Sequence, residues 1–188
     1  MTMKLNAREL RDIDENEVKI KLKHIKRRPI YFILENIYDT YNIGGLFRLA
    51  DALAIEKIYL CGETEIPPNS RIKKASIGTY KVVPWVYKKS ATEAIKELRD
   101  SRPANAGRQA RMVRIIAVEQ AKNSISYTKA DYKLPLTLVF GNETSGVTPE
   151  TLKLADEIVE IPMWGINKSL NVIVSAAIVS YFAVSTIG

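Results

Sequence analysis

Three clusters of polar residues follow apolar runs of the chain, and their residue types could bind an anion or align a small ligand. The first cluster extends from Asn36 to Arg48 and contains Asn42, Gly44 and Gly45. We predict that Asn42 caps a helix opened by the two glycines, so that the helix N-terminus can face an anion near the Arg48 guanidinium. The alternative is a structural helix with an ordinary N-cap, whose arginine extends from the core to solvent.

The second cluster, residues 140–150, has Glu143 between Gly141 and Gly146 directly after an apolar run. Glycines allow the backbone to approach a small ligand closely, and Thr148 is predicted to cap the helix that follows. A plain strand-to-helix turn would use the same residues and is the alternative. The cluster therefore indicates a tight loop at the end of a strand.

The third cluster, residues 161–172, contains Ser169 and Asn171 just before the most apolar segment of the chain. The amide of Asn171 is expected to be hydrogen-bonded, because a buried polar group without a partner costs roughly 1 to 3 kcal/mol. Helix capping explains one of these two polar residues but hardly both. A functional role for at least one of them is therefore favoured.

Short apolar runs alternate with amphipathic segments over most of the chain. The predicted strands are residues 30–34, 58–61, 113–118, 136–140 and 158–161, and the predicted helices are residues 44–54, 69–77, 91–102, 148–155 and 170–184. Continuously apolar strands that alternate with helices are typical of a mostly parallel sheet covered on both faces. The predicted fold class is α/β, with residues 1–28 as a basic helical arm and residues 29–188 as one domain.

The arm is predicted to contain an amphipathic helix. Asp14 can cap it, its apolar positions Val18, Leu22 and Ile25 recur at spacings of four and three, and Pro29 is expected to end it. No apolar signal segment precedes it, and no apolar run in the chain reaches the roughly 20 residues of a spanning helix. The sequence therefore predicts a cytoplasmic protein.

Composition points to a polyanionic partner and away from metal chemistry. The chain has 28 Lys and Arg against 21 Asp and Glu, a net charge of +7, which favours nucleic acid. Cys61, the only cysteine, closes an apolar run and is predicted to be buried, while His24 is the only histidine, so no metal site is expected. No Walker sequence or GxGxxG follows a predicted strand, which disfavours a standard nucleotide-binding enzyme.

Taken in order, the three clusters resemble the three motifs of the SpoU or TrmH branch of the SPOUT methyltransferases, which are RNA ribose 2′-O-methyltransferases. The resemblance extends from about Ile30 to Phe182 and includes residues 74–78 and 83–85 between the motifs. It implies an α/β fold with a C-terminal trefoil knot and S-adenosylmethionine bound in the knot. It also implies a homodimer whose active sites lie at the interface.

The resemblance assigns roles to individual residues. Those that match the expected catalytic positions are Asn42 and Arg48 in the first motif, Glu143 in the second, and Ser169 and Asn171 in the third. Those that match the cofactor pocket are Gly141, Ile161, Met163 and Leu170. The expected chemistry is transfer of a methyl group to a ribose hydroxyl, in which Arg48 holds the adjacent phosphate and stabilises the forming alkoxide.

Two positions depart from the family pattern. Ala54 stands where relatives usually have glycine, which we interpret as a harmless change at a helix end. Ile173 stands where the third motif often has serine, so any role of a hydroxyl at that position is missing.

Three basic runs are candidates for phosphate contacts with tRNA or rRNA. Their residues are Lys23, Lys26, Arg27 and Arg28 in the arm, Arg71, Lys73 and Lys74 in the middle of the chain, and Arg108 and Arg111 in a predicted loop. One alternative is a catalytically silent RNA-binding protein, whose mark would be a lost motif arginine or glutamate. Another is an α/β enzyme acting on a small phosphorylated metabolite, which the basic runs and the missing phosphate loop disfavour.

Overall fold

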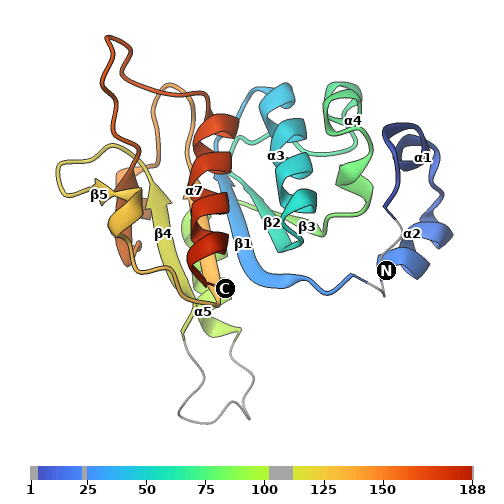
Figure 1. Ribbon diagram of the computed structural model, residues 1–188, viewed down its shortest axis with the longest axis horizontal. Coiled ribbons are helices and arrows are strands. Elements are labelled where there is room, and N and C mark those ends of the chain that lie inside the picture. The colour runs from blue at the N-terminus through green and yellow to red at the C-terminus, as the bar shows by residue number, and fades with distance from the viewer. Residues whose placement is uncertain (1–3, 23–24, 102–111, 188) are drawn as a thin grey trace.

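The computed structural model describes residues 4–22, 25–101 and 112–187, and it confirms the predicted α/β class. A seven-stranded sheet has the order β3-β2-β1-β6-β4-β7-β5, and its pairings are parallel (Figure 1). The strands are β1 (Arg28–Glu35), β2 (Ile55–Cys61), β3 (Trp85–Lys88), β4 (Arg114–Val118), β5 (Ile125–Ser126), β6 (Leu136–Phe140) and β7 (Glu157–Glu160).

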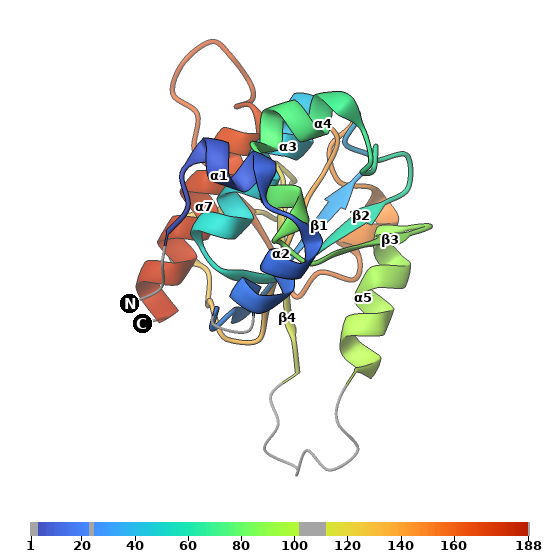
Figure 2. The same ribbon diagram turned by 90° about the vertical axis from the view of Figure 1, so that its right-hand side faces the viewer.

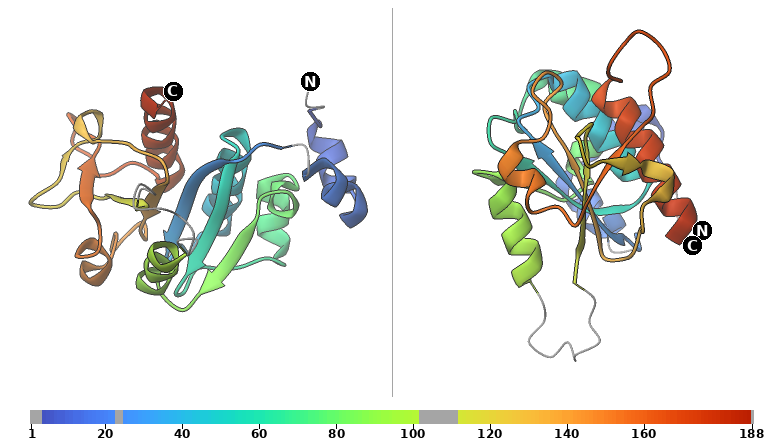
Figure 3. Two further views of the ribbon diagram at one scale, coloured as in Figure 1. Left: turned by 90° about the horizontal axis from the view of Figure 1, so that it is seen from below. Right: turned by 90° about the vertical axis from the view of Figure 1, so that its left-hand side faces the viewer.

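Helices cover both faces of the sheet. The α-helices in the described ranges are α1 (Ala7–Asp12), α2 (Glu15–Leu22), α3 (Thr40–Ala52), α4 (Ser70–Ser76), α5 (Ala91–Asp100), α6 (Pro149–Leu152) and α7 (Val172–Ile187). Helices α5 and α6 lie on one face, and α3, α4 and α7 lie on the other (Figure 3). Within the described ranges, no helix has the length and apolar character needed to cross a membrane.

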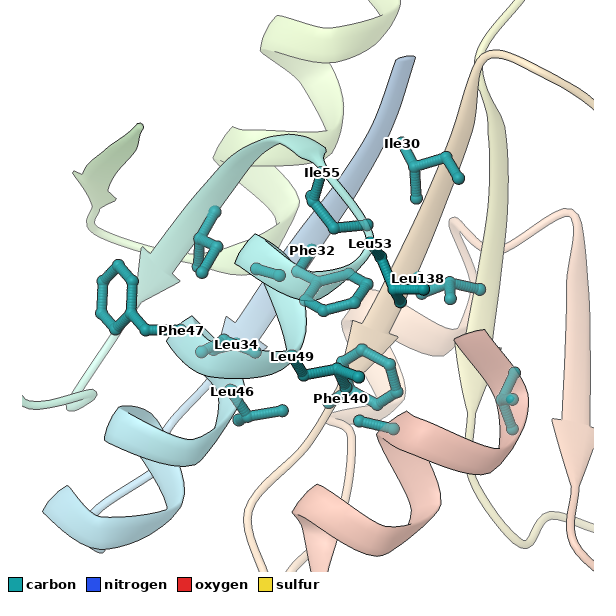
Figure 4. Close-up of a cluster of buried hydrophobic side chains, with 14 of the residues drawn as sticks. Ile30, Phe32, Leu34, Leu46, Phe47, Leu49, Leu53, Ile55, Leu138 and Phe140 are labelled. Carbon is teal, nitrogen blue, oxygen red and sulfur yellow. The ribbon is translucent and has the colours of Figure 1, made fainter. Parts of the chain in front are cut away.

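The central strands are buried on both faces, which explains their continuous hydrophobicity. In β1, Phe32 and Leu34 belong to the core under α3 and α7, whereas Ile33 belongs to the core under α5. Phe32 packs edge to face on Phe140 of β6, with ring centroids 5.3 Å apart (Figure 4). The predicted strands missed β3 and β5, because these edge strands are only partly buried and lack a continuous apolar run.

Helix α3 begins four residues before the predicted start, and Asn42 does not cap it. The N-cap is Asp39, whose carboxylate accepts a hydrogen bond from the Tyr41 amide at 2.8 Å. Gly44 and Gly45 lie inside the helix. Glycine is needed at Gly44 because a β-carbon there would overlap the backbone of α4, whereas a β-carbon at Gly45 would meet the end of the Ile173 side chain of α7. The predicted cap is therefore wrong, and Asn42 is free to act elsewhere.

The two departures from the family pattern both have structural consequences. Ala54 follows α3 with φ 51°, in the left-handed region that glycine adopts without strain. The alanine therefore costs about 1 kcal/mol, so the expectation of a harmless change is wrong. Ile173 packs its side chain over Gly45, so it joins α7 to α3 where a serine would leave a gap.

The arm differs from its predicted form. A first helix, α1, has a capping box formed by Asn6 and Glu9 that the prediction missed. Asp14 caps α2 as predicted, accepting hydrogen bonds from the backbone amides two and three residues further on. The helix ends at Leu22, and Pro29 belongs to β1, so the prediction that Pro29 ends the helix is wrong.

The arm is attached to the domain by apolar and polar contacts. Ile13 and Val18 are buried against Val82. The Lys81 ammonium donates to the carbonyl of Ile13 at 3.0 Å, and the Arg27 guanidinium donates to the carbonyls of Ile55 at 2.8 Å and Val82 at 2.5 Å. These contacts fix the arm beside α4 and β3 (Figure 2).

Candidate functional site

A cavity of about 330 Å³ lies beyond the carboxyl ends of β4, β6 and β7. Parallel sheets bind ligands at this edge. Its walls come from the ends of those strands and from the loops that follow them: Val118, Glu119, Gln120, Phe140, Gly141, Asn142, Glu143, Thr144, Ser145, Gly146, Val159, Glu160, Ile161, Met163, Lys168, Ser169, Leu170, Val172 and Ser175. The second and third sequence clusters therefore share one site.

Six of the residues singled out in the sequence line this cavity. They are the four predicted cofactor contacts, Gly141, Ile161, Met163 and Leu170, and two predicted catalytic residues, Glu143 and Ser169. Asn42 and Asn171 do not line it, but hydrogen bonds connect them to its rim. Among the described residues, Arg48 is the one predicted catalytic residue that neither lines the cavity nor takes part in the hydrogen bonds that connect Asn42 and Asn171 to its rim.

A hydrogen-bonded chain of three side chains joins all three sequence clusters. The Asn171 amide nitrogen donates to the Asn42 amide oxygen at 3.0 Å, and the Asn42 nitrogen donates to Glu143 Oε1 at 2.5 Å. Asn42 is buried, so both ends of its amide are satisfied by this chain. Residues more than a hundred positions apart are thereby held in one orientation.

Asn171 combines this contact with a capping role. It precedes α7, which begins at Val172 and not at Leu170 as predicted, and its side-chain oxygen accepts a hydrogen bond from the Ile173 amide at 2.8 Å. The residue is exposed overall, and the hydrogen bond of its amide to Asn42 is partly buried. The prediction that its amide is hydrogen-bonded is confirmed, because its nitrogen donates to Asn42.

The loop that carries Glu143 is anchored near both of its ends. The Asn142 side chain accepts from the amides of Thr144 at 2.8 Å and Ser145 at 2.9 Å, and donates to the Asn36 carbonyl at 2.8 Å. At the far end, the backbone amide and hydroxyl of Thr148 both donate to the buried Glu35 carboxylate at 2.9 Å. Anchors at both ends keep the position of Glu143 fixed.

Glu119 and Gln120, directly after β4, line the cavity and were not predicted from the sequence. Glu119 accepts hydrogen bonds from the amides of Val147 at 2.8 Å and Gln120 at 2.9 Å. The first of these bonds holds the loop that carries Glu143 against the end of β4. The Gln120 side chain donates to the Lys168 carbonyl at 2.7 Å and holds the loop before α7. A polar pair immediately after an apolar strand was the available signal, as in the other clusters.

The charge of the cavity lining is negative although the chain is basic. Its ionisable side chains in the described ranges are Glu119, Glu143, Glu160 and Lys168. A ligand that carries a positive charge would therefore be attracted to it. The apolar members of the wall can contact a flat aromatic group.

Arg48 is exposed on α3, three residues after Gly45. Residues three apart lie on the same side of a helix, so Arg48 is on the side of α3 that packs against α7. Its guanidinium is therefore available to a molecule that binds over the α3–α7 junction.

The predicted RNA contacts fall into three groups. Exposed residues are Lys26, Arg28, Arg71, Lys73 and Lys74. Arg27 is half-buried and its guanidinium donates to two carbonyls, which gives it a structural role. Lys23, Arg108 and Arg111 lie outside the described residues.

Cys61 is buried, which confirms its predicted structural character. Burial raises the pKa of its thiol far above the ordinary value, so the thiol stays protonated and does not act as a nucleophile. Among the residues that the structure describes, no group of three or more His, Cys, Asp and Glu side chains could hold a metal ion.

The sequence is similar to those of several RNA methyltransferases. The tRNA (guanosine(18)-2′-O)-methyltransferases of Aquifex aeolicus and Escherichia coli strain K12 are 29% and 28% identical to it over 84% of this chain, which covers 70% and 64% of those proteins. A 23S rRNA (guanosine-2′-O-)-methyltransferase of Ralstonia nicotianae is 28% identical over 87% of this chain and 61% of its own length.

Solved structures share the fold. An AdoMet-bound rRNA methyltransferase from Sinorhizobium meliloti has a TM-score of 0.75 and 27% identity, over 95% of this chain and 60% of that one. The SpoU methyltransferase AviRb from Streptomyces viridochromogenes, in complex with AdoMet, has a TM-score of 0.74 and 25% identity, over 88% and 64%. The chain thus spans between 60% and 70% of the length of the named relatives and structures above.

The family model agrees with these likenesses. The model of the SpoU rRNA Methylase family matches residues 29–181, a range that holds all three clusters and the cavity. The chain therefore belongs to the SpoU rRNA Methylase family.

Proposed function

We propose that this protein transfers a methyl group from S-adenosylmethionine to a ribose 2′-hydroxyl of tRNA or rRNA. The observation that carries the proposal is the hydrogen-bonded chain from Asn171 through Asn42 to Glu143, at the rim of a cavity with a negative lining. The three relatives named above, which are RNA 2′-O-methyltransferases of guanosine, support the same reaction.

The cavity fits S-adenosylmethionine in shape and in charge. Its volume is within the range of small-ligand pockets, about 300 to 1,000 Å³. Ile161, Met163 and Leu170 are at least partly exposed and offer apolar surface for an adenine ring, and the carboxylates of Glu119 and Glu160 suit a cation. When bound, the cofactor supplies a methyl group on a positively charged sulfur. An oxygen nucleophile can attack the methyl carbon in line with the C–S bond, which breaks and leaves a neutral thioether.

The protein's own residues have to align the hydroxyl and stabilise its developing negative charge. Arginine is effectively always protonated in proteins, so Arg48 does not act as a base. Its planar fork holds the phosphate beside the target ribose and stabilises the oxygen as the O–C bond forms. The hydroxyl proton leaves to that phosphate or to water.

The remaining motif residues act as positioning groups. The chain of Asn171, Asn42 and Glu143 fixes the start of α3 against the loop after β6, so the rim of the cavity keeps its shape. Ser169 is exposed and lines the cavity, where its hydroxyl can hydrogen-bond the cofactor or the ribose.

Methyl transfer itself is the test of the proposal. The full chain is incubated with S-adenosylmethionine carrying a labelled methyl group and with unfractionated tRNA or rRNA, and label in the RNA is counted. We expect incorporation into one of the two RNAs. RNA binding without incorporation would instead support the catalytically silent alternative, and failure of calorimetry to detect S-adenosylmethionine binding would support the metabolite enzyme.

The exposed basic residues near the start of β1 are expected to contact phosphate, whereas Arg27 holds the fold. Each phosphate contact contributes roughly 0.7 to 0.9 to the slope of log affinity against log salt, so the double variant Lys26→Ala, Arg28→Ala should flatten the slope by about 1.4 to 1.8. Arg27→Ala should leave the slope unchanged and lower the free energy of unfolding by roughly 1 to 3 kcal/mol, because two carbonyls lose their donor.

RNA-binding titrations at several salt concentrations, together with denaturant unfolding, check both expectations. A slope that falls for Arg27→Ala and not for the double variant would reverse these assignments.

The protein is expected to be a homodimer that uses the surface of α7. Large apolar side chains are exposed on α7 and on the loop that rises before it (Figure 1): Trp164, Ile166, Leu170, Val174 and Tyr181. A monomeric protein rarely exposes so many large apolar side chains, and Arg48 is exposed on α3, which packs against α7, so an active site at the interface is favoured. A C-terminal trefoil knot and a cytoplasmic location are parts of the same proposal.

Sedimentation checks the dimer. Tyr181→Asp is expected to give a monomer, because a carboxylate would be buried at the interface, whereas Tyr87→Asp on edge strand β3 should leave the dimer intact. A wild-type protein that sediments as a monomer at every concentration would contradict the dimer.

A further inference from the structure

A second hollow, separate from the cavity of the candidate site, lies between the starts of α3 and α4. It measures about 290 Å³ and is lined by Tyr38, Asp39, Thr40, Tyr41, Glu65, Asn69, Ser70 and Arg71. The two tyrosines are 57% and 54% exposed, although each has a large apolar ring. Neither packing nor the proposed methyl transfer accounts for this pair of exposed rings.

The hollow is held in shape by its surroundings. Asp39 caps α3 and Asn69 caps α4, each accepting a hydrogen bond from a backbone amide two residues further on, at 2.8 and 2.9 Å. The two helices lie side by side at the contact between Gly44 and Ala75, which leaves no space for a β-carbon. A ligand that enters the hollow would therefore meet a surface that is already formed, so little ordering cost opposes binding.

The hollow is adjacent to the candidate site. Tyr41 directly precedes Asn42, whose amide donates to Glu143 on the rim of the cofactor cavity. Arg71 begins the basic run that continues with the exposed Lys73 and Lys74 along α4. A polyanion that reaches the cavity along α4 would pass over the two tyrosines.

The chemistry of the lining matches an unpaired nucleotide. Unstacked RNA bases bind proteins by stacking on aromatic rings, and an arginine beside the rings can hold the phosphate. Glu65 is exposed and offers a carboxylate that can accept a hydrogen bond from the amino group of a base. Aromatic rings, a cation and the Glu65 acceptor thus line one hollow of suitable size, together with Asp39, whose carboxylate is engaged by the Tyr41 amide.

We propose that this hollow binds an unpaired base of the RNA substrate that flanks the methylated nucleotide. The inference rests on the proposed function, since it takes RNA as the substrate. Tyr38 and Tyr41 stack on the base, Arg71 holds its phosphate, and Glu65 favours a base with an amino group.

The first experiment measures the affinity of fluorescein-labelled unfractionated tRNA for the full chain by fluorescence anisotropy. Stacking of one base contributes about 1 to 3 kcal/mol, so Tyr38→Ala and Tyr41→Ala should each raise the Kd by about 5- to 150-fold. Tyr38→Phe and Tyr41→Phe, which keep the ring, should bind within about twofold of wild type. Tyr87→Ala is the matched control, because Tyr87 is an exposed tyrosine that does not line the hollow.

A second arm tests the acceptor. An RNA of twelve cytidines presents the N4 amino groups of its bases, and an RNA of twelve uridines has no such groups. Wild type should therefore bind the cytidine RNA more tightly. Glu65→Ala should reduce this preference, because alanine removes the acceptor. An unchanged preference would remove Glu65 from base recognition.

The outcomes separate the hollow from the proposed function. A wild-type protein that binds no tRNA and transfers no methyl group would contradict the proposed function itself. Wild-type binding and transfer with equal tRNA affinity in both alanine variants would contradict only the hollow. A third outcome is that the alanine variants dimerise more weakly than wild type in sedimentation, yet bind tRNA as tightly as wild type at concentrations where variant and wild type are both dimers. That result would assign the tyrosines to contact with a second copy and overturn the proposal.

Discussion

Arg48→Ala is expected to abolish methyl transfer while leaving the affinity for S-adenosylmethionine nearly unchanged. The guanidinium is exposed on α3 and does not line the cofactor cavity, so its removal leaves that cavity intact. Loss of one preorganised donor to a developing oxyanion typically lowers kcat about 100- to 1,000-fold, and loss of the phosphate fork adds to this. Labelled methyl incorporation under saturating cofactor measures the first effect, and calorimetry measures the second.

Arg48→Lys distinguishes charge from geometry. Lysine keeps the positive charge but lacks the planar fork, so we expect this variant to fail as well. Arg8→Ala, which removes an exposed arginine from the distant helix α1, is the matched control and should retain activity. Near-normal turnover by Arg48→Lys would contradict the phosphate-fork role.

Gly141→Ala is expected to have the largest effect on cofactor binding. A β-carbon at this position would overlap the backbone of Gly146 and Val147, and backbone atoms cannot turn aside as a side chain can. The loop after β6 would have to shift, and this loop forms one wall of the cavity. We expect the affinity for S-adenosylmethionine to fall on the order of 100-fold and the free energy of unfolding to fall by about 1 to 3 kcal/mol.

Gly165→Ala is the matched control for this substitution. Gly165 lies in the loop before α7, and a β-carbon there would have no neighbouring atom within 4 Å. Cofactor affinity and stability should therefore stay at wild-type values. Equal cofactor affinities for the two alanine variants in calorimetry would contradict the close-packed geometry of the loop after β6.

Much of the fold and of the cavity could be predicted from the sequence, because buried parallel strands leave a simple pattern. The continuous apolar run before Gly141 ends where β6 ends, and the polar residues that follow it reach the cavity as predicted. The family resemblance, carried by three ordered motifs, is confirmed by the match over residues 29–181. The three motifs follow β1, β6 and β7, whose carboxyl ends lie at one edge of the sheet, so together they indicate a single site.

Other features could not be predicted because long-range contacts decide them. Asp39 and Asn42 are both good N-cap residues, and in the structure Asp39 caps α3 while the Asn42 side chain bonds Glu143, 101 positions further on. The strand position of Pro29 depends on pairing of β1 with β2, which local propensity does not reveal. Similarly, the basic run of the arm gave no sign that Arg27 would turn inward to two carbonyls.

The most direct test of the proposed function is identification of the methylated product. RNA methylated by the full chain with S-adenosylmethionine is digested to nucleosides and analysed by mass spectrometry. We expect a nucleoside whose additional methyl mass remains with the ribose fragment, and its absence in the Arg48→Ala reaction. A methyl group found on the base fragment, or no methylated nucleoside from either tRNA or rRNA, would contradict ribose methylation by this protein.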